Sequence, residues 1–492
     1  MSSLNTVHPE GLEQIRTLPV TVLQIGEGNF LRGFFDWMMN ECIRRNLFPG
    51  SIAVMQPRPS GQDSIARLAS QDGLYTLVTR GLEAGVPVSR TEIISVFSKV
   101  FDPYTEWEEF KRLAVSPGLR VVVSNTTEAG LSYLPEPLGS GPILSFPGKI
   151  AYLLYLRYTA YPDSSSHGLI FLPCELLERN GEALRDAVLK YADDWGFSAE
   201  FKEWVIRHNR FLNSLVDRIV TGYPEEAQAE AWFEEWGYRD RMLCTAEPYH
   251  LWAIEAEPEL GKLLPFHEAG LNVHWTNDLV PFQQRKVRIL NGMHTWMAPL
   301  GLLYGVGHVR ELLEHEELGE RLRLLAGREI IPALPYPAEE MEAYAAEVRD
   351  RFANPHIVHR LSAIAMNSLS KFRIRLLPSL AWYEEQGRAV PEQLMLGLAG
   401  LLRYYKVNRE PDGTFTGTAF NGQSYTVSDN AAQLERMAEI WSCASAAGEA
   451  LSQTVNVLLA EELFWGQSLA EWACLADNVT AWLTTWERMN TA

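Results

Sequence analysis

The chain has 492 residues, of which 47% are hydrophobic and 21% are charged, values typical of a globular protein with a sizeable core. Lys and Arg together number 43 and Asp and Glu 62, so the formal net charge is −19. This excess of negative charge argues against nucleic acid or an anionic membrane as a partner.

The cysteines and the N-terminus set further limits. The five cysteines are scattered, and none forms a Cys-x-x-Cys pair or a cluster with histidine. This pattern is typical of reduced thiols rather than a disulfide framework or a zinc site, so we expect no metal. The first residues are polar, and no apolar run approaches a membrane-spanning length. We therefore expect a soluble, cytoplasmic protein.

The first strong element is a β-branched, apolar run at 19–25 that leads into a Gly-x-Gly turn and an amphipathic helical pattern. Strand, glycine turn and helix form the arrangement in which backbone N–H groups receive a pyrophosphate. Leu31 stands where the third glycine of the fingerprint belongs, so a tight turn without a ligand is the alternative. We predict a dinucleotide-binding turn that includes Gly26, Gly28, Asn29 and Phe30.

The next predicted strand covers 51–56 and is followed by a proline-rich break. A carboxylate at this point would bind the ribose 2′-hydroxyl of NAD, whereas an arginine would suit the 2′-phosphate of NADP. Here Gln56 is followed by Arg58, so the residues leave the choice open. We predict that Gln56 contacts the cofactor.

Later strands place polar residues where ligands bind. A hairpin is predicted from 74–80 and 91–100, and two buried strands follow at 119–124 and 169–175. Ligands sit beyond the carboxyl ends of strands in a doubly wound sheet. We predict cofactor contacts for Asn125, Thr126 and Glu128, and a substrate contact for Glu175. Turn formation by Asn and Thr, and a helix-start role for Glu175, are the alternatives.

Helical patterns dominate the second half of the chain. We place a domain boundary near residue 280, with an α/β, Rossmann-type NAD-binding domain with insertions at 1–280 and an all-α substrate and catalytic domain at 281–492. The glycine-containing stretch 408–429 is predicted to be a long loop.

Lys286, Asn291 and His294 are spaced by five and three residues in an apolar helical pattern. On an α-helix they fall within an arc of roughly 140°. A desolvated lysine can exchange a proton, an amide N–H can stabilise a developing alkoxide, and a histidine can orient either group. We predict catalysis of alcohol and ketone interconversion, with a solvated polar stripe as the alternative. Gly292 beside Asn291 suggests a close approach.

The densest basic cluster of the second half spans 351–375. An exposed cationic helix face is the ordinary interpretation. In so acidic a chain, however, these groups could hold a substrate carboxylate through charge-assisted hydrogen bonds. We predict substrate contacts for Lys371, Arg373 and Arg375.

Taken together, these stretches resemble the long-chain polyol and uronate dehydrogenases of the mannitol dehydrogenase family, and within it the tagaturonate reductase (altronate oxidoreductase) branch. The resemblance runs along most of the chain in the family's order, through segments 24–32, 71–76, 124–130, 170–181, 215–224, 285–295 and 351–378.

The resemblance implies a Rossmann domain and a helical domain with the active site between them, and hydride transfer with NAD and without zinc. Lys286 matches the family's general acid/base, Asn291 the amide that polarises the reacting oxygen, and His294 the histidine of the same motif. Lys371 matches a substrate-binding lysine, and Gly26 and Gly28 match the nucleotide turn.

Two departures separate the chain from the polyol branch. Leu176 stands where that branch has a second oxygen-binding Asn, and Ala363 stands where it has a polyol-binding Arg. The resemblance thus implies NADH-linked reduction of the sugar acid D-tagaturonate to D-altronate. Fructuronate reduction to mannonate, another polyol dehydrogenase and a non-catalytic NAD-binding sensor remain alternatives, and the oligomeric state stays open.

Overall fold

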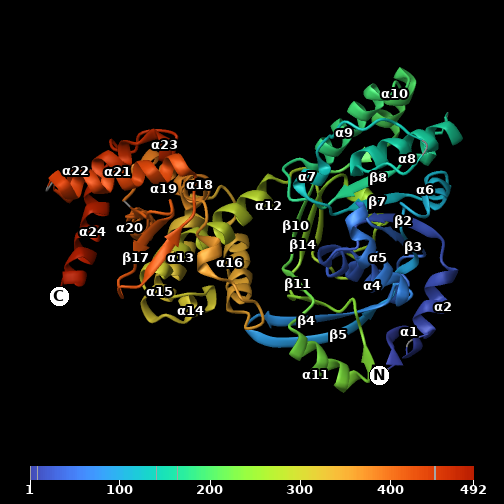
Figure 1. Ribbon diagram of the computed structural model, residues 1–492, viewed down its shortest axis with the longest axis horizontal. Coiled ribbons are helices and arrows are strands. Elements are labelled where there is room, and N and C mark those ends of the chain that lie inside the picture. Colours follow the sequence, from blue (N-terminus) through green and yellow to red (C-terminus); the bar gives the residue numbers. More distant parts are fainter. Residues whose placement is uncertain are drawn as a thin grey trace. The chain divides into compact units, whose positions relative to one another are not determined.

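The computed structural model describes residues 2–7, 9–139, 141–162, 164–389, 391–447 and 450–491, and it divides into two compact units. The first unit comprises Met1–Gly81 and Pro87–Leu279, and the second comprises Leu82–Val86 and Val280–Ala492. Figure 1 shows both, coloured along the sequence.

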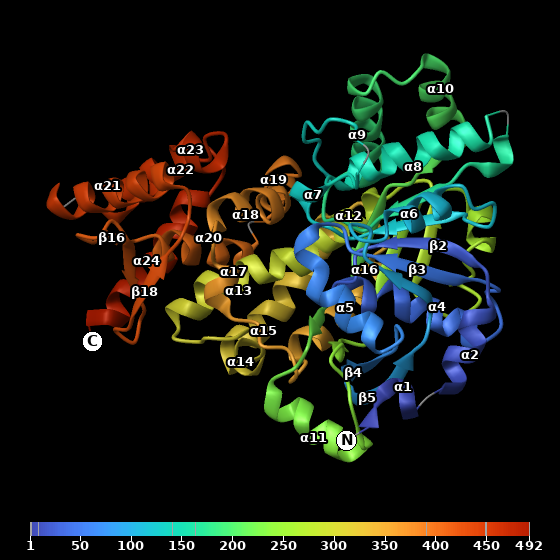
Figure 2. The same ribbon diagram turned by 45° about the vertical axis from the view of Figure 1, so that its right-hand side comes forward.

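A six-stranded parallel sheet forms the centre of the first unit (Figures 1 and 2). Its strand order is β6-β3-β2-β7-β8-β9, so the chain reverses direction across the sheet between β2 and β7. In this type of sheet, ligands bind at the carboxyl ends near that reversal. The strands are β2 (Val20–Ile25), β3 (Ser51–Met55), β6 (Phe97–Phe101), β7 (Val121–Ser124), β8 (Ile170–Pro173) and β9 (Arg210–Phe211).

Alternating side chains place one hydrophobic core on each face of this sheet. Val121 and Val123 belong to one core, and Val122 between them belongs to the other, as the two-residue period of a strand requires. Helices α4 (Phe35–Arg44) and α5 (Gln62–Ser70) pack in the first core. Helices α6 (Trp107–Ala114), α8 (Phe146–Ala160), α9 (Asn180–Asp194) and α10 (Ala199–His208) pack in the second. The predicted Rossmann-type fold is confirmed.

The helix expected after the glycine turn is interrupted. It consists of α3 (Asn29–Arg32) and α4, which are separated by Gly33 and Phe34. A Cβ on Gly33 would lie 2.6 Å from a methyl group of Val220 in β11 (Val220–Gly222), so only glycine lets this strand approach. The break in the helix thus lies where a strand from a distant part of the sequence packs, and the helical period could not reveal this contact.

Smaller sheets complete the first unit. One has the order β10-β14-β15, with β10 (Ser214–Asp217), β14 (Leu251–Glu255) and β15 (Val273–Thr276). Another has the order β11-β13-β4-β5, with β13 (Cys244–Ala246), β4 (Tyr75–Glu83) and β5 (Val86–Ile94). The remaining elements are β1 (Ser2–Ser3), β12 (Tyr238–Arg239), α1 (Leu4–Val7), α2 (Pro9–Thr17), α7 (Glu128–Leu131), α11 (Glu226–Trp236) and the 3-10 turns η1 (Pro59–Gly61), η2 (Ser165–His167) and η3 (Pro258–Lys262).

The hairpin of β4 and β5 has a two-residue turn at Ala84 and Gly85, whose φ values of 49° and 75° are typical of a type I′ turn. The predicted second strand, 91–100, is in fact divided. Its first part ends β5, and its last part is β6 at the edge of the parallel sheet. The hairpin tip, Leu82–Val86, belongs to the second unit, where the Gly85 N–H donates to the Asp350 carboxylate at 3.0 Å.

The second unit is mainly helical. Helix α13 (Asn291–Leu303) packs on α20 (Glu392–Tyr404), and the Trp296 indole N–H donates to the Gln393 carbonyl at 2.7 Å. A Cβ on Gly397 would lie 2.4 Å from the Trp296 ring, so this glycine permits the close helix contact. The other helices are α12 (Val280–Arg285), α14 (Val309–Glu314), α15 (Glu316–Leu324), α16 (Ala338–Ala353), α17 (Leu361–Ile364), α18 (Ser368–Arg375), α19 (Leu377–Glu385), α21 (Ala431–Ala447), α22 (Leu451–Ala460), α23 (Glu462–Trp465) and α24 (Leu475–Thr491).

Two segments of the second unit are wide, π-helical turns, η4 (Lys286–Leu290) and η5 (Leu325–Ile330), and η6 (Ile331–Ala333) is a 3-10 turn. The stretch predicted as a long loop, 408–429, instead forms a small antiparallel sheet. Its strands are β16 (Asn408–Arg409), β17 (Phe415–Thr418) and β18 (Ser424–Val427). These strands are only two to four residues long, and the segments between them contain the turn formers Pro411, Gly413, Asn421 and Gly422, so the sequence is similar to that of a loop.

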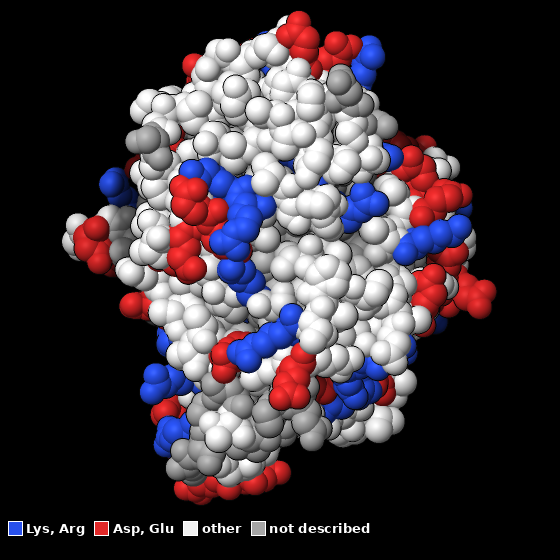
Figure 3. Space-filling model, turned by 90° about the vertical axis from the view of Figure 1, so that its right-hand side faces the viewer, with Lys and Arg blue, Asp and Glu red and all other residues white. Residues whose placement is uncertain are grey.

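Among the described residues, no helix combines the length and the apolar character needed to cross a membrane. Nor do three His, Cys, Asp or Glu side chains gather in that part of the chain as a metal site requires. On the face shown in Figure 3, acidic and basic side chains are interspersed, and much of the surface carries neither.

Candidate active site

The glycine turn follows β2 at the centre of the parallel sheet. Gly26 has a φ of +122°, and a Cβ there would lie 2.9 Å from the carbonyl oxygen of Asn125. Only glycine satisfies both conditions. At Gly28, by contrast, a Cβ would have no neighbour within 4 Å. The turn is thus held close to β7 on one side and has open space on the other, where a dinucleotide could approach.

Arg32 holds this turn in place. It is 5% exposed, and its guanidinium donates to the Glu27 carbonyl at 3.1 Å and to the Asn29 Oδ1 at 2.6 Å. The Phe30 ring stacks on Phe34, with their centroids 4.9 Å apart. The side chains of Asn29 and Phe30 are therefore used in the fold of the turn. Their predicted cofactor contacts remain a prediction.

Gln56 follows β3 and is fully buried. Among the described residues, neither its Oε1 nor its Nε2 has a hydrogen-bond partner. The same holds for Oε2 of Glu27, which is 7% exposed. Burial raises the pKa of the Glu27 carboxyl. Polar atoms that are both buried and unsatisfied are costly, so these atoms are available to a ligand.

Glu175 lies just after β8 and joins this strand to β7. Its carboxylate accepts hydrogen bonds from the Ser124 hydroxyl at 3.1 Å, the Thr126 N–H at 2.8 Å and the Thr126 hydroxyl at 3.1 Å. It is 3% exposed, and burial raises its pKa. Glu175 therefore positions the loop after β7. The substrate contact predicted for it is untested, and the hydrogen bonds account for its buried carboxylate without one.

The remaining residues of this loop are arranged in the same way. The Asn125 side chain donates to the Cys174 carbonyl at 2.8 Å, which again joins β7 to β8. Thr127 caps the short helix α7 by accepting from the Gly130 N–H at 2.9 Å. Glu128, the first residue of α7, is exposed. The loop is thus fixed by its own polar side chains and by Glu175.

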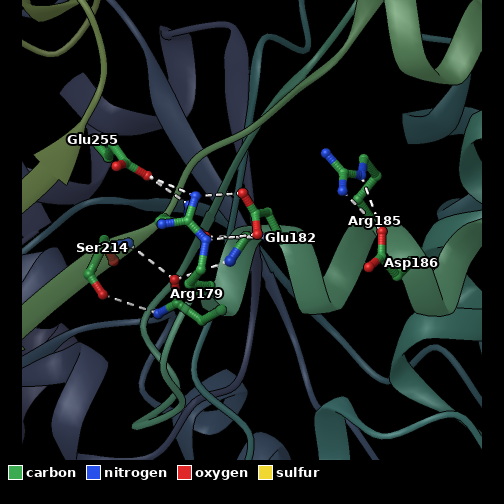
Figure 4. Close-up of polar contacts among 9 residues, drawn as sticks. Arg179, Glu182, Arg185, Asp186, Ser214 and Glu255 are labelled. Atoms are coloured by element: carbon green, nitrogen blue, oxygen red, sulfur yellow. Dashed lines mark hydrogen bonds and ion pairs between the residues drawn. The ribbon is translucent and has the colours of Figure 1, made fainter. Parts of the chain in front are cut away.

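The segment after Glu175 is fixed by Asn180, which the sequence analysis did not single out. Its side chain donates to the carbonyls of Pro173, Glu175 and Ser214 at 3.0 to 3.1 Å. Arg179 next to it has a φ of 52° and lies between Glu182 and Glu255 (Figure 4). The side chains that follow β8 therefore hold the backbone around Glu175 firmly in place.

In the second unit, the predicted catalytic residues lie on a helix with a wide turn. Lys286 begins η4, and the Asn291 N–H donates to the Lys286 carbonyl, which is a bond between residues five apart. A residue in such a turn rotates by less than the roughly 100° of an α-helix. Lys286 and Asn291 therefore lie closer to one face than the regular helical period predicts. Wide turns of this kind are frequent at functional sites.

His294 lies one turn further along α13 and is surrounded by rings and cations. Its ring centroid is 4.4 Å from that of Phe352 and 5.8 Å from that of His359. Its Nε2 is buried and has no hydrogen-bond partner among the described residues. Burial, together with the charges of nearby groups that include His359, Arg351 and Arg375, lowers the pKa of His294 to about 3. The imidazole is therefore neutral near pH 7.

The predicted basic residues of α18 separate into two groups. Lys371 donates to the Ile364 carbonyl at 2.8 Å, and Arg375 donates to the Thr295 hydroxyl at 3.1 Å, beside His294. Burial lowers the pKa of Lys371, and the charge of Arg375 adds to the effect. Arg373 is exposed and lies against Gly466. Lys371 and Arg375 are four residues apart and share a helix face, whereas Arg373 is two residues from each and lies on another face. The spacing in the sequence could therefore have separated the two groups.

The second unit thus gathers an amine, a carboxamide and a neutral imidazole on one helix, with cations around the imidazole. Such a set can exchange a proton with an alcohol or ketone oxygen, stabilise that oxygen and hold an anionic group. Arg351, which is 5% exposed, and His359 also belong to this set, because their charges lower the pKa of His294. Both lie in the basic segment that the sequence analysis identified, but they were not predicted as site residues.

Comparison with protein-family models gives two matches that together cover most of the chain. Residues 20–266 match the Mannitol dehydrogenase Rossmann domain, and residues 278–487 match the Mannitol dehydrogenase C-terminal domain.

Two curated relatives are similar over nearly their whole length. The altronate oxidoreductase of Halalkalibacterium halodurans is 42% identical over 94% of this chain and 90% of its own. The altronate oxidoreductase of Bacillus subtilis is 41% identical over 94% of this chain and 92% of its own.

Two solved structures share the fold. A D-sorbitol dehydrogenase in substrate-free form has a TM-score of 0.75 at 19% identity, covering 97% of this chain and 95% of its own. The mannitol 2-dehydrogenase of Pseudomonas fluorescens, in a ternary complex with NAD and D-mannitol, has a TM-score of 0.63 at 22% identity, covering 97% and 94%.

Proposed function

The chain belongs to the mannitol dehydrogenase family, and from this we propose that it is an oxidoreductase that interconverts a sugar acid and its keto form with NAD(H). The substrate pair is D-altronate and D-tagaturonate. The names of the two bacterial relatives support the pair, since their similarity extends over nearly the full chain.

The single observation that carries the choice of an acid substrate is the cationic surrounding of His294. Arg351, Arg375 and Lys371 all lower its pKa, which means that their charges act at the imidazole. A neutral polyol gains little from three cations, whereas a carboxylate pairs with them through charge-assisted hydrogen bonds. Arg375 already lies beside Thr295, next to His294 in the chain. We assign the substrate carboxylate to this group, with Lys371 and Arg375 as its ligands.

The residues of the first unit fit a dinucleotide. Gly26 and Gly28 form a turn with open space at Gly28, and Glu27 and Gln56 offer unsatisfied polar atoms at the ends of β2 and β3. When bound, NAD(H) accepts or supplies the hydride. The chain's own residues orient it: Arg32 fixes the carbonyl of the turn, and Glu175 fixes the neighbouring loop. In this proposal, residues 1–280 form the cofactor domain and residues 281–492 the catalytic domain.

We assign the proton transfer to Lys286. In the reductive direction its ammonium group gives a proton to the ketone oxygen, and in the oxidative direction its neutral amine takes the hydroxyl proton. The oxidative rate should therefore rise with pH. The Asn291 amide N–H stabilises the negative charge that develops on the oxygen. Neutral His294 acts as a hydrogen-bonding group that positions its neighbours rather than as an ion.

The cysteines support a proposal for the compartment. All five cysteines are unpaired, which is typical of a reducing compartment. The cytoplasm is where we propose that the enzyme acts on its small-molecule substrate.

The test is oxidation of NADH with tagaturonate, fructuronate and fructose, each measured with the wild type and Lys286→Ala. We expect turnover confined to tagaturonate and a loss of at least a hundredfold in kcat for Lys286→Ala, because general acid catalysis contributes about that much or more. Lys262→Ala, a change at an exposed lysine, is the matched control. Preference for fructuronate would identify this epimer, rather than tagaturonate, as the substrate. Cofactor binding without turnover of any compound would indicate a sensor.

A further inference from the structure

The carboxyl ends of β2 and β3 meet at Gly61, the last residue of η1. A Cβ on Gly61 would lie 3.0 Å from Oε1 of Glu27 and 3.0 Å from the Cβ of Gln56. The two side chains therefore face one small region, and a larger residue at position 61 would fill it. Gly61 has a φ of −84°, so no backbone strain explains a glycine here. Glycine at this position lets both side chains pack close to the backbone, and an added Cβ would push them apart.

Three polar atoms around this region have no hydrogen-bond partner among the described residues, namely Oε2 of Glu27 and Oε1 and Nε2 of Gln56. Gln56 is fully buried and Glu27 is 7% exposed, so water does not satisfy them from the surface. Two of these atoms accept hydrogen bonds and one donates. A pair of neighbouring hydroxyl groups matches this set, because each hydroxyl can both donate and accept.

The charge of the site adds a second criterion. An arginine near the end of the second strand would suit a 2′-phosphate, and Arg58 stands two residues after Gln56. Arg58 is exposed, however, whereas Glu27 is buried beside Gln56. Burial raises the pKa of Glu27, while the charges of Arg32 and Arg58 and a hydrogen bond from Ser64 oppose this rise. A phosphate brought to this place would meet a carboxylate at short range.

We propose that Glu27 and Gln56 bind the two hydroxyl groups of the adenosine ribose, and that Glu27 excludes a 2′-phosphate, so that the chain selects NAD over NADP. The acidic residue that usually reads these hydroxyls follows the second strand. In this chain Gln56 occupies that position, and the carboxylate comes from the middle of the glycine turn instead. The inference rests on the proposed function, because it assumes that a dinucleotide binds at Gly26 and Gly28.

The test measures the dissociation constants of NADH and NADPH by calorimetry without substrate, so that turnover is not needed. We expect wild-type protein to bind NADH at least tenfold more tightly than NADPH. Glu27→Gln should weaken NADH binding about tenfold and bring the two constants close together, since hydrogen bonds to a charged group are worth one to two powers of ten in affinity. Asp63→Asn, which removes one charge from an exposed residue of neighbouring α5, should leave the ratio unchanged.

A second variant covers the case in which Glu27→Gln fails to fold. Gly61→Ala fills the shared space, so it should weaken NADH and NADPH alike by about tenfold while the melting temperature stays near that of the wild type. Equal NADH and NADPH affinities in the wild type, or an unchanged ratio in Glu27→Gln, would overturn the inference and leave the proposed function standing. Wild-type protein that binds neither nucleotide would overturn both.

Discussion

Acid should destabilise the folded protein through His294, and the size of the effect follows from its burial. The pKa of His294 is lowered from 6.5 to about 3. In the unfolded chain this imidazole takes up a proton as the pH falls below 6.5, whereas in the folded protein it stays neutral until about pH 3. Its contribution to stability is therefore complete above the unfolded pKa and is lost as the pH falls below it. At about 1.36 kcal/mol per unit, the loss at roughly pH 5 is about 2 kcal/mol.

The assay is urea unfolding of wild type and His294→Gln, each at about pH 7 and about pH 5. Between these two values the wild type should lose about 2 kcal/mol more of its free energy of unfolding than the variant, which has no imidazole to protonate. His267→Gln, a change at an exposed histidine, should behave as the wild type does. An identical pH dependence in wild type and His294→Gln would refute the assignment of His294 as a buried neutral imidazole.

Three further predictions concern the loop, the substrate site and the turn. Glu175→Ala leaves the buried hydroxyl of Ser124 and the partly buried donors of Thr126 without an acceptor and should lower the free energy of unfolding by about 2–4 kcal/mol, measured with urea; an unchanged midpoint would contradict its positioning role. Arg375→Ala should raise KM for the sugar acid about tenfold or more, whereas Arg373→Ala, its exposed neighbour on α18, should not. Equal changes in KM for the two variants would show that the substrate carboxylate does not bind at Arg375. Gly26→Ala should cost about 1–3 kcal/mol of stability and weaken NADH binding, because its φ is +122°; calorimetric melting and titration would show it.

Much of the fold of the first unit could be predicted from the sequence, because its parallel strands are short apolar runs followed by glycine or polar residues. The interruption of the helix at Gly33 could not, since it lies where Val220, which is far away in the chain, packs against the glycine. The small sheet formed by β16, β17 and β18 was predicted as a loop. Its strands are two to four residues long and are separated by turn formers such as Gly413 and Gly422, so only their pairing distinguishes them from a loop.

The sequence predicted which residues belong to the candidate site better than it predicted what their side chains contact. The spacing of Lys286, Asn291 and His294 indicated a shared helix face, but the wide turn that brings the first two together has no pattern in the apolar residues. We expected the loop residues Asn125 and Thr126 to face a ligand, whereas Asn125 donates to the Cys174 carbonyl just after β8 and the Thr126 N–H donates to Glu175. Polar residues after a strand can serve either purpose, and the sequence carries no signal that separates the two.

The wide turn at η4 has a consequence for the length of the chain. A turn closed between residues five apart holds one residue more than the α-helical turn that it replaces. If the same residues formed a regular α-helix, Lys286 and Asn291 would lie about 140° apart, because five steps of about 100° exceed one full turn by that amount. Deleting one residue within 287–289 would instead leave the lysine four residues before the asparagine, about 40° from it, so that the pair would still share a face. The direction of the lysine therefore depends on the match between the number of residues and the width of the turn.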